Sequence, residues 1–249
     1  MIRTLAELDT PVVVVDLEVM EDNISRMAAY CKKYELKLRP HVKTHKTVDI
    51  ARLQMNAGAC GIACQKLGEA EVMVTAGLTD ILVCYNIVGQ QKLVRLRDLA
   101  SRANLSVPLD SSGVADGISW AACAAGTSIG VLIELDVGGG RTGVQSPKAA
   151  LDLARHILKL RGLELLGLLI YPSTPRASPQ LDETITLLQD DGIPISIVSG
   201  GGTTTAFSSH QSIIPNQACG VVNLHEQLIA VRGENVEGIW EVRARGKTQ

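Results

Sequence analysis

Two histidines and two lysines lie close together near the start of the chain, in the segment RPHVKTHK at residues 39–46. A strand that ends at Lys43 would place Lys37, Arg39, His41 and Lys43 on one face, because alternate side chains of a strand point the same way. A lysine screened from water and close to other cations loses proton affinity, so its amine can attack a carbonyl. We therefore predict Lys43 as an amine nucleophile, with His41 transferring protons or orienting Lys43. The alternative is a solvated basic turn.

A loop rich in glycine and threonine, SGGGTTTA, occupies residues 199–206 after the last predicted parallel strand. Its glycines let the main chain approach a ligand closely, and its N–H groups and threonine hydroxyls suit a phosphate dianion. Barrel enzymes often bind phosphate in the loops after late strands. The segment therefore predicts a phosphate site, with a flexible linker as the alternative.

A second glycine-rich loop, DVGGGRTGV at residues 136–144, contains one cation, Arg141. The guanidinium of an arginine there can donate to a phenolate or a carboxylate, and a turn with a solvated arginine is the alternative. The spacing of Gly138, Gly140 and Gly143 matches a dinucleotide-binding fingerprint, but the loop precedes no good helix start and lacks a suitably placed acid. We therefore do not expect a dinucleotide site.

The composition limits the class of protein. Hydrophobic residues make up 46% of the 249 residues and aromatic residues only 3%, so Val, Ile, Leu and Ala must build the core, as in parallel α/β folds. A net charge of −2 gives no indication of a nucleic-acid or membrane partner. The first ten residues carry no apolar signal core, and no run reaches the roughly 20 apolar residues of a membrane span. We expect a cytoplasmic protein with a small polar partner.

The candidate residues need a scaffold that brings distant loops to one edge. Short β-branched runs alternate with amphipathic segments, which is typical of a parallel sheet covered by helices. Strands are predicted at residues 12–16, 38–43, 60–64, 81–85, 106–110, 130–136, 163–171 and 195–199. Helices are predicted at residues 20–34, 66–76, 88–102 and 146–160. So many consecutive units favour a TIM-type (β/α) barrel over an open doubly wound sheet.

Polar residues recur where the predicted strands end, among them Lys43, Gln65, Arg141 and Ser199. In both architectures the carboxyl ends of the strands form the active edge. A nucleophilic lysine at an early strand and a phosphate loop at a late strand are what pyridoxal 5′-phosphate requires, because its aldehyde and its phosphate lie at opposite ends. The sequence therefore predicts this cofactor.

Five segments resemble a known enzyme group: RPHVKTHKT (39–47), GIACQKLGEAEVMVTAG (61–77), DILVCYNIVG (80–89), ELDVGGGRTGV (134–144) and SGGGTTT (199–205). They look like the D-threonine aldolase and D-serine dehydratase group of fold-type III pyridoxal-phosphate enzymes, over roughly residues 8–206. The resemblance implies a barrel of the alanine racemase N-terminal domain kind, with the cofactor bound covalently to Lys43. The further cofactor-binding residues that it implies are Gln65, Arg141, Tyr171, Gly201, Gly202 and Thr203.

The C-terminal part departs from the group that the chain resembles. The resemblance implies a completed barrel and then a β-rich domain, so we predict an incomplete barrel at residues 1–206 and a reduced β segment at residues 207–249. It also implies a site for Mn²⁺ or Zn²⁺, with ligands at the positions that here hold Gln217 and Cys219. Cys219 could bind a metal, but the amide of Gln217 is a poor substitute for imidazole, so we expect a weakened metal site.

An incomplete barrel would leave unpaired strand edges unless residues 12–16, the tail or a partner covered them. Residues 229–231 and 239–242 are predicted to form a small hairpin across residues 233–235. The resemblance implies a homodimer in which each active site borrows from the partner's C-terminal domain.

By resemblance, the chain is expected to be a pyridoxal-phosphate-dependent lyase acting on D-configured β-hydroxy amino acids. The expected reaction is retro-aldol cleavage of D-threonine-like substrates to glycine and an aldehyde. Dehydration by a D-serine dehydratase, with release of ammonia, is one alternative. An amino-acid racemase of the same fold is a second alternative, although it would need a second base that the sequence does not identify. A non-catalytic pyridoxal-phosphate carrier is a third alternative, and it would explain the short chain.

Overall fold

Six parallel strands form the main sheet of the computed structural model, which describes residues 3–202 and 226–244. They are β2 (Ile62–Cys64), β3 (Asp80–Val83), β4 (Asn104–Leu109), β5 (Ile129–Leu135), β6 (Leu163–Ile170) and β7 (Ile197–Gly200). Each strand pairs in parallel with the next one along the chain, and the sheet curves into a half-barrel. The predicted barrel of the alanine racemase kind is therefore confirmed, in an open form within the described residues.

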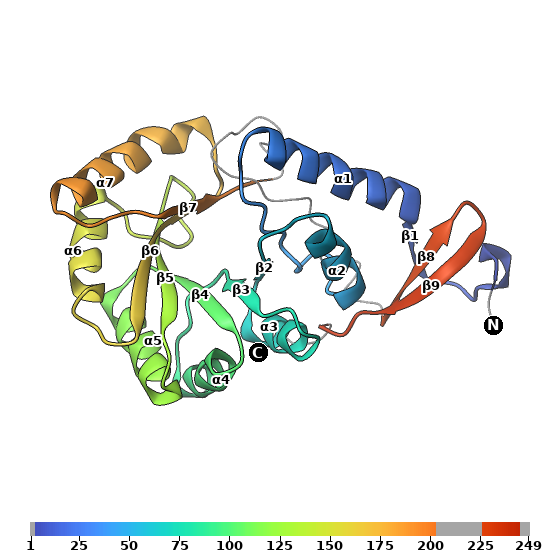
Figure 1. The fold of residues 1–249 in the computed structure, drawn as a ribbon, viewed down its shortest axis with the longest axis horizontal. Coiled ribbons are helices and arrows are strands. Elements are labelled where there is room, and N and C mark those ends of the chain that lie inside the picture. The colour runs from blue at the N-terminus through green and yellow to red at the C-terminus, as the bar shows by residue number, and fades with distance from the viewer. Residues whose placement is uncertain (1–2, 203–225, 245–249) are drawn as a thin grey trace.

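Helices connect the strands and cover the outer side of the sheet. They are α1 (Leu17–Lys33), α2 (Val48–Asn56), α3 (Leu67–Thr75), α4 (Gln90–Ala100), α5 (Ser112–Ala125), α6 (Pro147–Ile157) and α7 (Ser178–Asp190), with short 3-10 helices η1 (Leu5–Glu7) and η2 (Pro175–Ala177). In Figure 1, α3 to α7 run round the outside of the sheet. The four predicted helices are confirmed, whereas α2, α5 and α7 were not predicted.

Aliphatic side chains fill the space between the sheet and its helices. Ile62, Ile81 and Ile133 on the strands are fully buried, as are Met73 of α3 and Ile118 of α5. Burying a side chain of this size contributes about 1.5–3 kcal/mol, and truncating Ile133 to alanine would cost about 2–5 kcal/mol. The rigid sheet fixes the strand ends, which hold the candidate residues.

The prediction of a strand at residues 38–43 is wrong, because the structure has no strand there. The main chain makes a single bridge there, between His41 and Ala63, and turns at once, with Lys46 N–H donating to Val42 O at 2.8 Å. Pro40 has no N–H with which to extend a ladder, and Lys46 has a left-handed backbone with a φ of 55°. Lys43 therefore lies in a tight turn directly after one bridge, beside the carboxyl end of β2.

A second, smaller sheet joins the two ends of the described chain. Strand β1 (Val13–Asp16) pairs in parallel with β8 (Gln227–Arg232), which forms a hairpin with β9 (Asn235–Glu241). The predicted hairpin is confirmed. Within the described residues, β1 and the tail pair with each other and do not extend the edge of the half-barrel (Figure 1). The domain boundary at residue 206 stays a prediction, because residues 203–225 lie outside the described residues.

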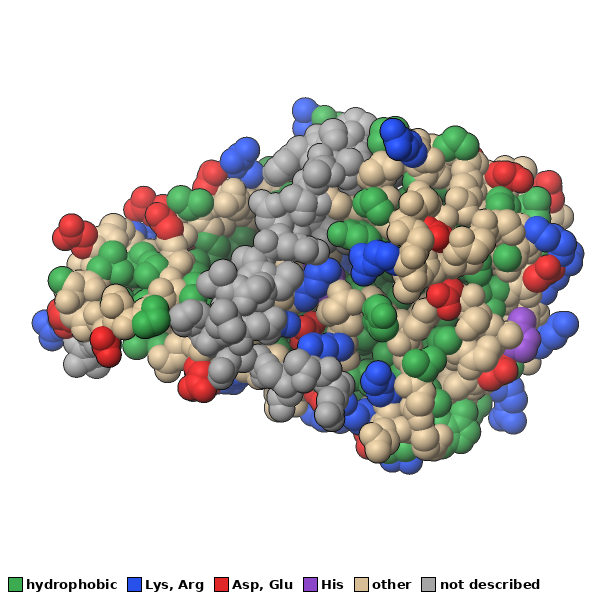
Figure 2. All heavy atoms as spheres, turned by 180° about the vertical axis from the view of Figure 1, so that it is seen from behind, with side chains coloured by type: hydrophobic (Ala, Val, Ile, Leu, Met, Phe, Trp, Pro, Cys, Tyr) green, Lys and Arg blue, Asp and Glu red, His purple; other side chains and the backbone are tan. Residues whose placement is uncertain are grey.

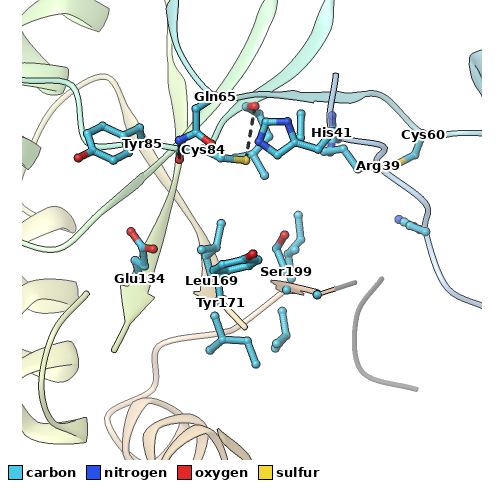
Figure 3. A pocket seen from close by; sticks show the side chains of 18 of the residues that line it. Arg39, His41, Cys60, Gln65, Cys84, Tyr85, Glu134, Leu169, Tyr171 and Ser199 are labelled. Carbon is cyan, nitrogen blue, oxygen red and sulfur yellow. Dashed lines mark hydrogen bonds between the residues drawn. The ribbon is translucent and has the colours of Figure 1, made fainter. Parts of the chain in front are cut away.

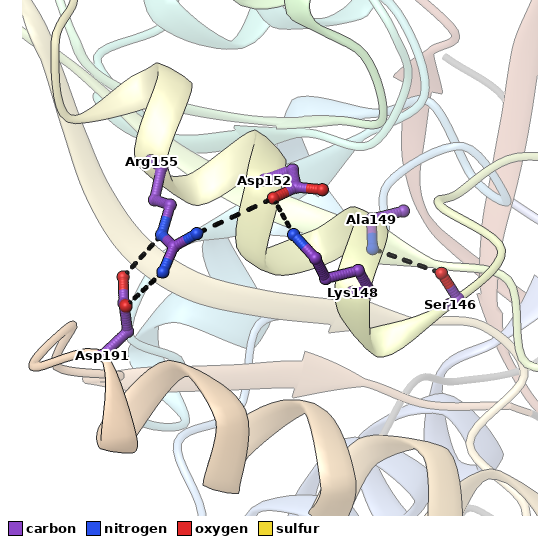
Figure 4. A network of polar contacts seen from close by, with 6 residues as sticks. All are labelled: Ser146, Lys148, Ala149, Asp152, Arg155 and Asp191. Carbon is purple, nitrogen blue, oxygen red and sulfur yellow. Dashed lines mark hydrogen bonds and ion pairs between the residues drawn. The ribbon is translucent and has the colours of Figure 1, made fainter.

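Polar contacts fix the outer helices. Ser146 caps α6, because its Oγ accepts from the N–H of Ala149 at 3.2 Å. Arg155 Nε donates to Asp191 Oδ2 at 2.8 Å and joins α6 to the end of α7 (Figure 4).

On the face in Figure 2, Lys and Arg side chains occur alongside Asp and Glu. Among the described helices, none has the length and apolar character needed to cross a bilayer.

Candidate active site

A pocket of about 400 Å³ opens at the carboxyl ends of the half-barrel strands, within the range typical of small-molecule sites. The residues that follow the early and late strands meet there, although they are far apart in sequence. Its polar lining includes Lys37, Arg39, His41, Lys43, Gln65, Glu134, Arg141, Tyr171 and Ser199. The four residues predicted to share a face, from Lys37 to Lys43, therefore line one pocket despite the absence of a strand.

The amine of Lys43 is held inside this pocket by an amide. Its Nζ donates to Gln65 Oε1 at 3.2 Å, and Gln65 Nε2 donates in turn to the main-chain oxygen of Cys84 at 3.2 Å. The second contact fixes the amide so that its oxygen faces the lysine. Burial raises the pKa of the Cys84 thiol to about 12, which keeps that side chain protonated and a poor nucleophile. Among the described residues that line the pocket, Lys43 is the amine that Gln65 holds.

Lys46 is not an alternative to Lys43. Its side chain is only 4% exposed and is ion-paired with Glu69, which is fully buried. Lys46 lies outside the set of residues that line the pocket. The two lysines of the 39–46 segment therefore have different surroundings, since Lys43 lines the pocket and Lys46 is buried in an ion pair.

His41 lies in the pocket wall as a neutral ring. Burial is the largest cause that lowers its pKa to about 3, and the charges of Lys43, Lys46 and His45 add to the shift, partly opposed by the Gln65 amide. His41 Nδ1 accepts from the main-chain N–H of Lys43 at 3.2 Å, which assigns the ring proton to Nε2. That Nε2 atom is buried and makes no hydrogen bond with the described residues.

An aromatic ring lies across the pocket from these groups. The Tyr171 ring centroid is 6.0 Å from Lys43 Nζ and 5.6 Å from the guanidinium carbon of Arg141. In Figure 3, Gln65, Cys84 and His41 lie along one side of the pocket, and Leu169, Tyr171 and Ser199 along the other. The space between them has a polar wall and a flat ring, which suits a planar polar ligand.

A carboxyl group that the sequence did not single out also lines the pocket. Burial raises the pKa of Glu134, whose Oε1 accepts from Thr142 Oγ1 at 2.7 Å. The glycine-rich loop after β5 is braced beside it, because Asp136 Oδ1 accepts from the N–H groups of residues 138–140 and Asp110 Oδ2 from that of Gly143 at 3.1 Å. Asp110 therefore holds the loop and does not line the pocket.

The predicted phosphate loop is only partly described. Gly200 and Gly202 line the pocket, and Gly201 O accepts from the N–H of Ser173 at 2.8 Å. Thr203 and both predicted metal ligands, Gln217 and Cys219, lie outside the described residues. Within the described part, no group of three or more His, Cys, Asp or Glu side chains could hold a metal ion.

The pocket residues fit pyridoxal 5′-phosphate. Lys43 supplies the amine that its aldehyde needs, main chain from Gly200 and Gly202 lies at the end of a late strand, and Tyr171 lies at the side of the pocket. The buried Nε2–H of His41, with no partner among the described residues, is a donor that a bound ligand could satisfy.

Comparisons with known proteins agree with this arrangement. The family described as alanine racemase, N-terminal domain, matches residues 15–214. The chain is 37% identical over 216 residues to a D-threonine aldolase of Arthrobacter sp., covering 81% of this chain and 57% of the relative. It is 35% identical over 221 residues to a D-threo-3-hydroxyaspartate dehydratase of Delftia sp. (strain HT23), covering 83% and 58%. The chain thus spans less than two thirds of the length of either curated relative.

A solved structure is similar over the whole chain. The crystal structure of a D-threonine aldolase from Filomicrobium marinum matches with a TM-score of 0.94 and 26% identity, covering 100% of this chain and 99% of that chain. The half-barrel and the small sheet are therefore both found in a known arrangement.

Proposed function

This chain belongs to the alanine racemase N-terminal domain family, and from that premise we propose that it is a pyridoxal-phosphate-dependent lyase acting on D-configured β-hydroxy amino acids. The proposed reaction is retro-aldol cleavage of D-threonine-like substrates to glycine and an aldehyde. The observation that carries the proposal is the amine of Lys43, which lies in a pocket and is hydrogen-bonded to Gln65 at 3.2 Å. The similarity to D-threonine aldolases supports the choice of substrate class.

When bound, the cofactor supplies an aldehyde that bonds to amines and an electron sink for the negative charge that develops at the substrate Cα. Lys43 would hold it covalently, and Gln65 Oε1 would orient the amine. The Nε2–H of His41 would donate to a bound oxygen or nitrogen atom, since Nδ1 is occupied by the Lys43 N–H. Arg141 would donate to the phenolic oxygen of the cofactor or to the substrate carboxylate. Tyr171 would pack beside the cofactor ring.

The other proposed cofactor contacts are at the end of β7. Gly201, Gly202 and Thr203 would hold the phosphate through main-chain N–H groups and a hydroxyl, as the glycine-rich sequence suggests. A metal at Cys219 stays a weaker proposal, because its expected partner position holds the neutral amide of Gln217. No step of the proposed reaction is assigned to it.

Dehydration is the second candidate, and the similarity to a D-threo-3-hydroxyaspartate dehydratase favours it. Retro-aldol cleavage needs a base at the β-hydroxyl, whereas dehydration needs an acid for the leaving hydroxide. Glu134 lines the pocket and is the carboxyl group that we propose for this step. Burial raises its pKa, which favours the protonated carboxyl that a dehydration requires. The products distinguish the two reactions.

The test is a product assay with purified protein and pyridoxal phosphate. D-threonine, L-threonine and D-serine are supplied separately, with and without Mn²⁺ or Zn²⁺, beside the Lys43→Ala variant. We expect glycine and acetaldehyde from D-threonine alone, and none from the variant. Ammonia and a keto acid would favour the dehydratase. Full cofactor binding without any product would contradict both lyase assignments.

The assembly and the compartment are also proposals. We propose a homodimer in the cytoplasm, and the five cysteines of the described residues, all free thiols, suit a reducing compartment. Light scattering on the purified protein should give twice the mass of one chain. A monomer with full activity would contradict the dimer.

A further inference from the structure

A buried ion pair contacts the residue whose side chain accepts from the amine of Lys43. The carboxylate of Glu69, on the first turn of α3, is ion-paired through Oε1 with Lys46, and its Oε2 accepts from the main-chain N–H of Gln65 at 2.7 Å. Glu69 is 0% exposed and Lys46 is 3% exposed. One buried carboxylate thus holds the turn that carries Lys43 and the residue whose amide contacts it.

Both segments are short, and Glu69 contacts both of them. Gln65 follows the three-residue strand β2 and precedes α3, so its main chain is fixed by Glu69 and its side chain by the oxygen of Cys84. The turn of Lys43 closes at Lys46, whose left-handed backbone donates to Val42 O at 2.8 Å. The ion pair therefore connects the two ends of the Lys43–Gln65 hydrogen bond.

Two buried charges are costly unless each is paired. A neutral pair of similar volume would fill this space without that cost, so charge is not needed for packing alone. An ionised carboxylate accepts stronger hydrogen bonds than a neutral amide does, and its position at the start of α3 is favoured by the helix dipole. These properties favour a role in geometry near the amine.

We propose that Glu69 and Lys46 are positioning residues, which hold Gln65 and the turn so that the amine of Lys43 meets the cofactor aldehyde. The inference rests on the proposed function, since it concerns how the same lysine is presented. Neither residue lines the pocket, so they act through Gln65 and through the main chain of the turn.

The test compares the parent protein with the double variant Lys46→Met/Glu69→Gln, which removes both charges at similar volume. The matched control is Glu71→Gln on the same helix, where Glu71 pairs with Arg95 at 2.7 Å on a partly exposed face. The melting temperature of each protein is measured first, without cofactor. Each protein is then mixed with pyridoxal phosphate, and its visible circular dichroism reports the environment of the bound cofactor. Reduction with borohydride at successive times, followed by peptide mapping by mass spectrometry, gives the rate at which Lys43 is labelled.

We expect the double variant to melt within a few degrees of the parent. The rate of labelling at Lys43 should fall at least tenfold, and the visible circular dichroism should be lost, while Glu71→Gln should match the parent in both. Labelling of Lys43 at the parental rate, with unchanged dichroism, would overturn this inference alone. A parent protein that is not labelled at Lys43 would overturn the proposed function as well.

A second variant, Glu69→Asp, tests the same inference if the double variant does not fold. Glu69→Asp keeps the buried charge but is one methylene shorter, so it cannot reach both Lys46 and the Gln65 N–H in the same way. The same loss of Lys43 labelling is expected, with restoration in the reverted protein. Parental labelling in Glu69→Asp would again contradict the positioning role.

Discussion

Lys43 Nζ donates a hydrogen bond to Gln65 Oε1 at 3.2 Å, across 22 positions of sequence. The contact joins a tight turn to the residue that follows β2, and it orients an amine toward the pocket. Lys46, three residues further on, is instead buried in an ion pair. The pocket thus distinguishes two lysines that look alike in the sequence.

Removing the amide that holds Lys43 should weaken cofactor binding. In Gln65→Leu the amine loses its acceptor, and we expect the dissociation constant for pyridoxal phosphate to rise about tenfold, as for the loss of a hydrogen bond of about 1.5 kcal/mol. Fluorescence titration measures this constant. Gln90→Leu, at the exposed start of α4, is the control and should bind as the parent does. Equal affinity in both variants would contradict the role of Gln65.

The sheet could be predicted because its strands are short β-branched runs between turn residues. The segment at residues 38–43 has a similar pattern, but Pro40 and the turn at Lys46 limit it to one bridge. Helix α5 was missed because Gly113 and Gly117 weaken its pattern and it is apolar on several sides. Local sequence does not reveal such tertiary effects.

The place of Lys43 in the pocket could be predicted, because a lysine among other basic residues is chemically distinctive, and its role as the cofactor-binding amine stays a prediction. Glu69 and Glu134 were missed, because their contacts are with residues that only the fold brings near. A signal for Glu69 was present: it lies among the apolar residues Leu67, Ala70 and Met73, on the buried side of α3. A carboxylate in such surroundings needs a partner.

Acid should destabilise the protein through two buried histidines. Burial lowers the pKa of His41 to about 3 and that of His45 to about 4, so between these values and 6.5 the unfolded chain binds protons that the folded chain does not. Stability is therefore present above pH 6.5 and is lost as the pH falls. Each histidine should remove about 2 kcal/mol between pH 7 and pH 5.

Urea unfolding at pH 7 and pH 5 measures this loss. In His45→Gln, which cannot be protonated, the loss should be smaller than in the parent by about the contribution of one histidine. His156→Gln is the control, because His156 is a surface residue that pairs with Asp116. An identical pH dependence in parent and His45→Gln would contradict the assignment of a buried neutral ring.

Glu134 should have the opposite pH dependence. Burial raises its pKa, so the folded chain binds the proton more tightly than the unfolded chain, and stability is lost as the pH rises through the folded pKa. In Glu134→Gln this loss disappears, so the variant should gain thermal stability relative to the parent more at pH 7 than at pH 4. A larger relative gain at pH 4 would contradict the shift.

Gly61 should not tolerate a side chain. A Cβ there would lie 2.6 Å from Asp80 Oδ1 and would also collide with Arg39 Nη1, the two atoms that form an ion pair at 2.6 Å beside the pocket. We expect Gly61→Ala to destabilise the fold by about 1–3 kcal/mol. Gly113→Ala, in an open part of α5, should instead stabilise it by about 0.5–1 kcal/mol. Denaturant melts of both variants decide this, and equal effects would contradict the crowding at Gly61.

The most direct test of the central claim is the site at which the protein binds the cofactor covalently. The protein is mixed with pyridoxal phosphate, reduced with borohydride and digested, and the modified peptide is sequenced by mass spectrometry. The account predicts one modified lysine, Lys43, with Lys46 unmodified because it is buried and paired. Modification of Lys46 in place of Lys43, or of neither, would contradict it.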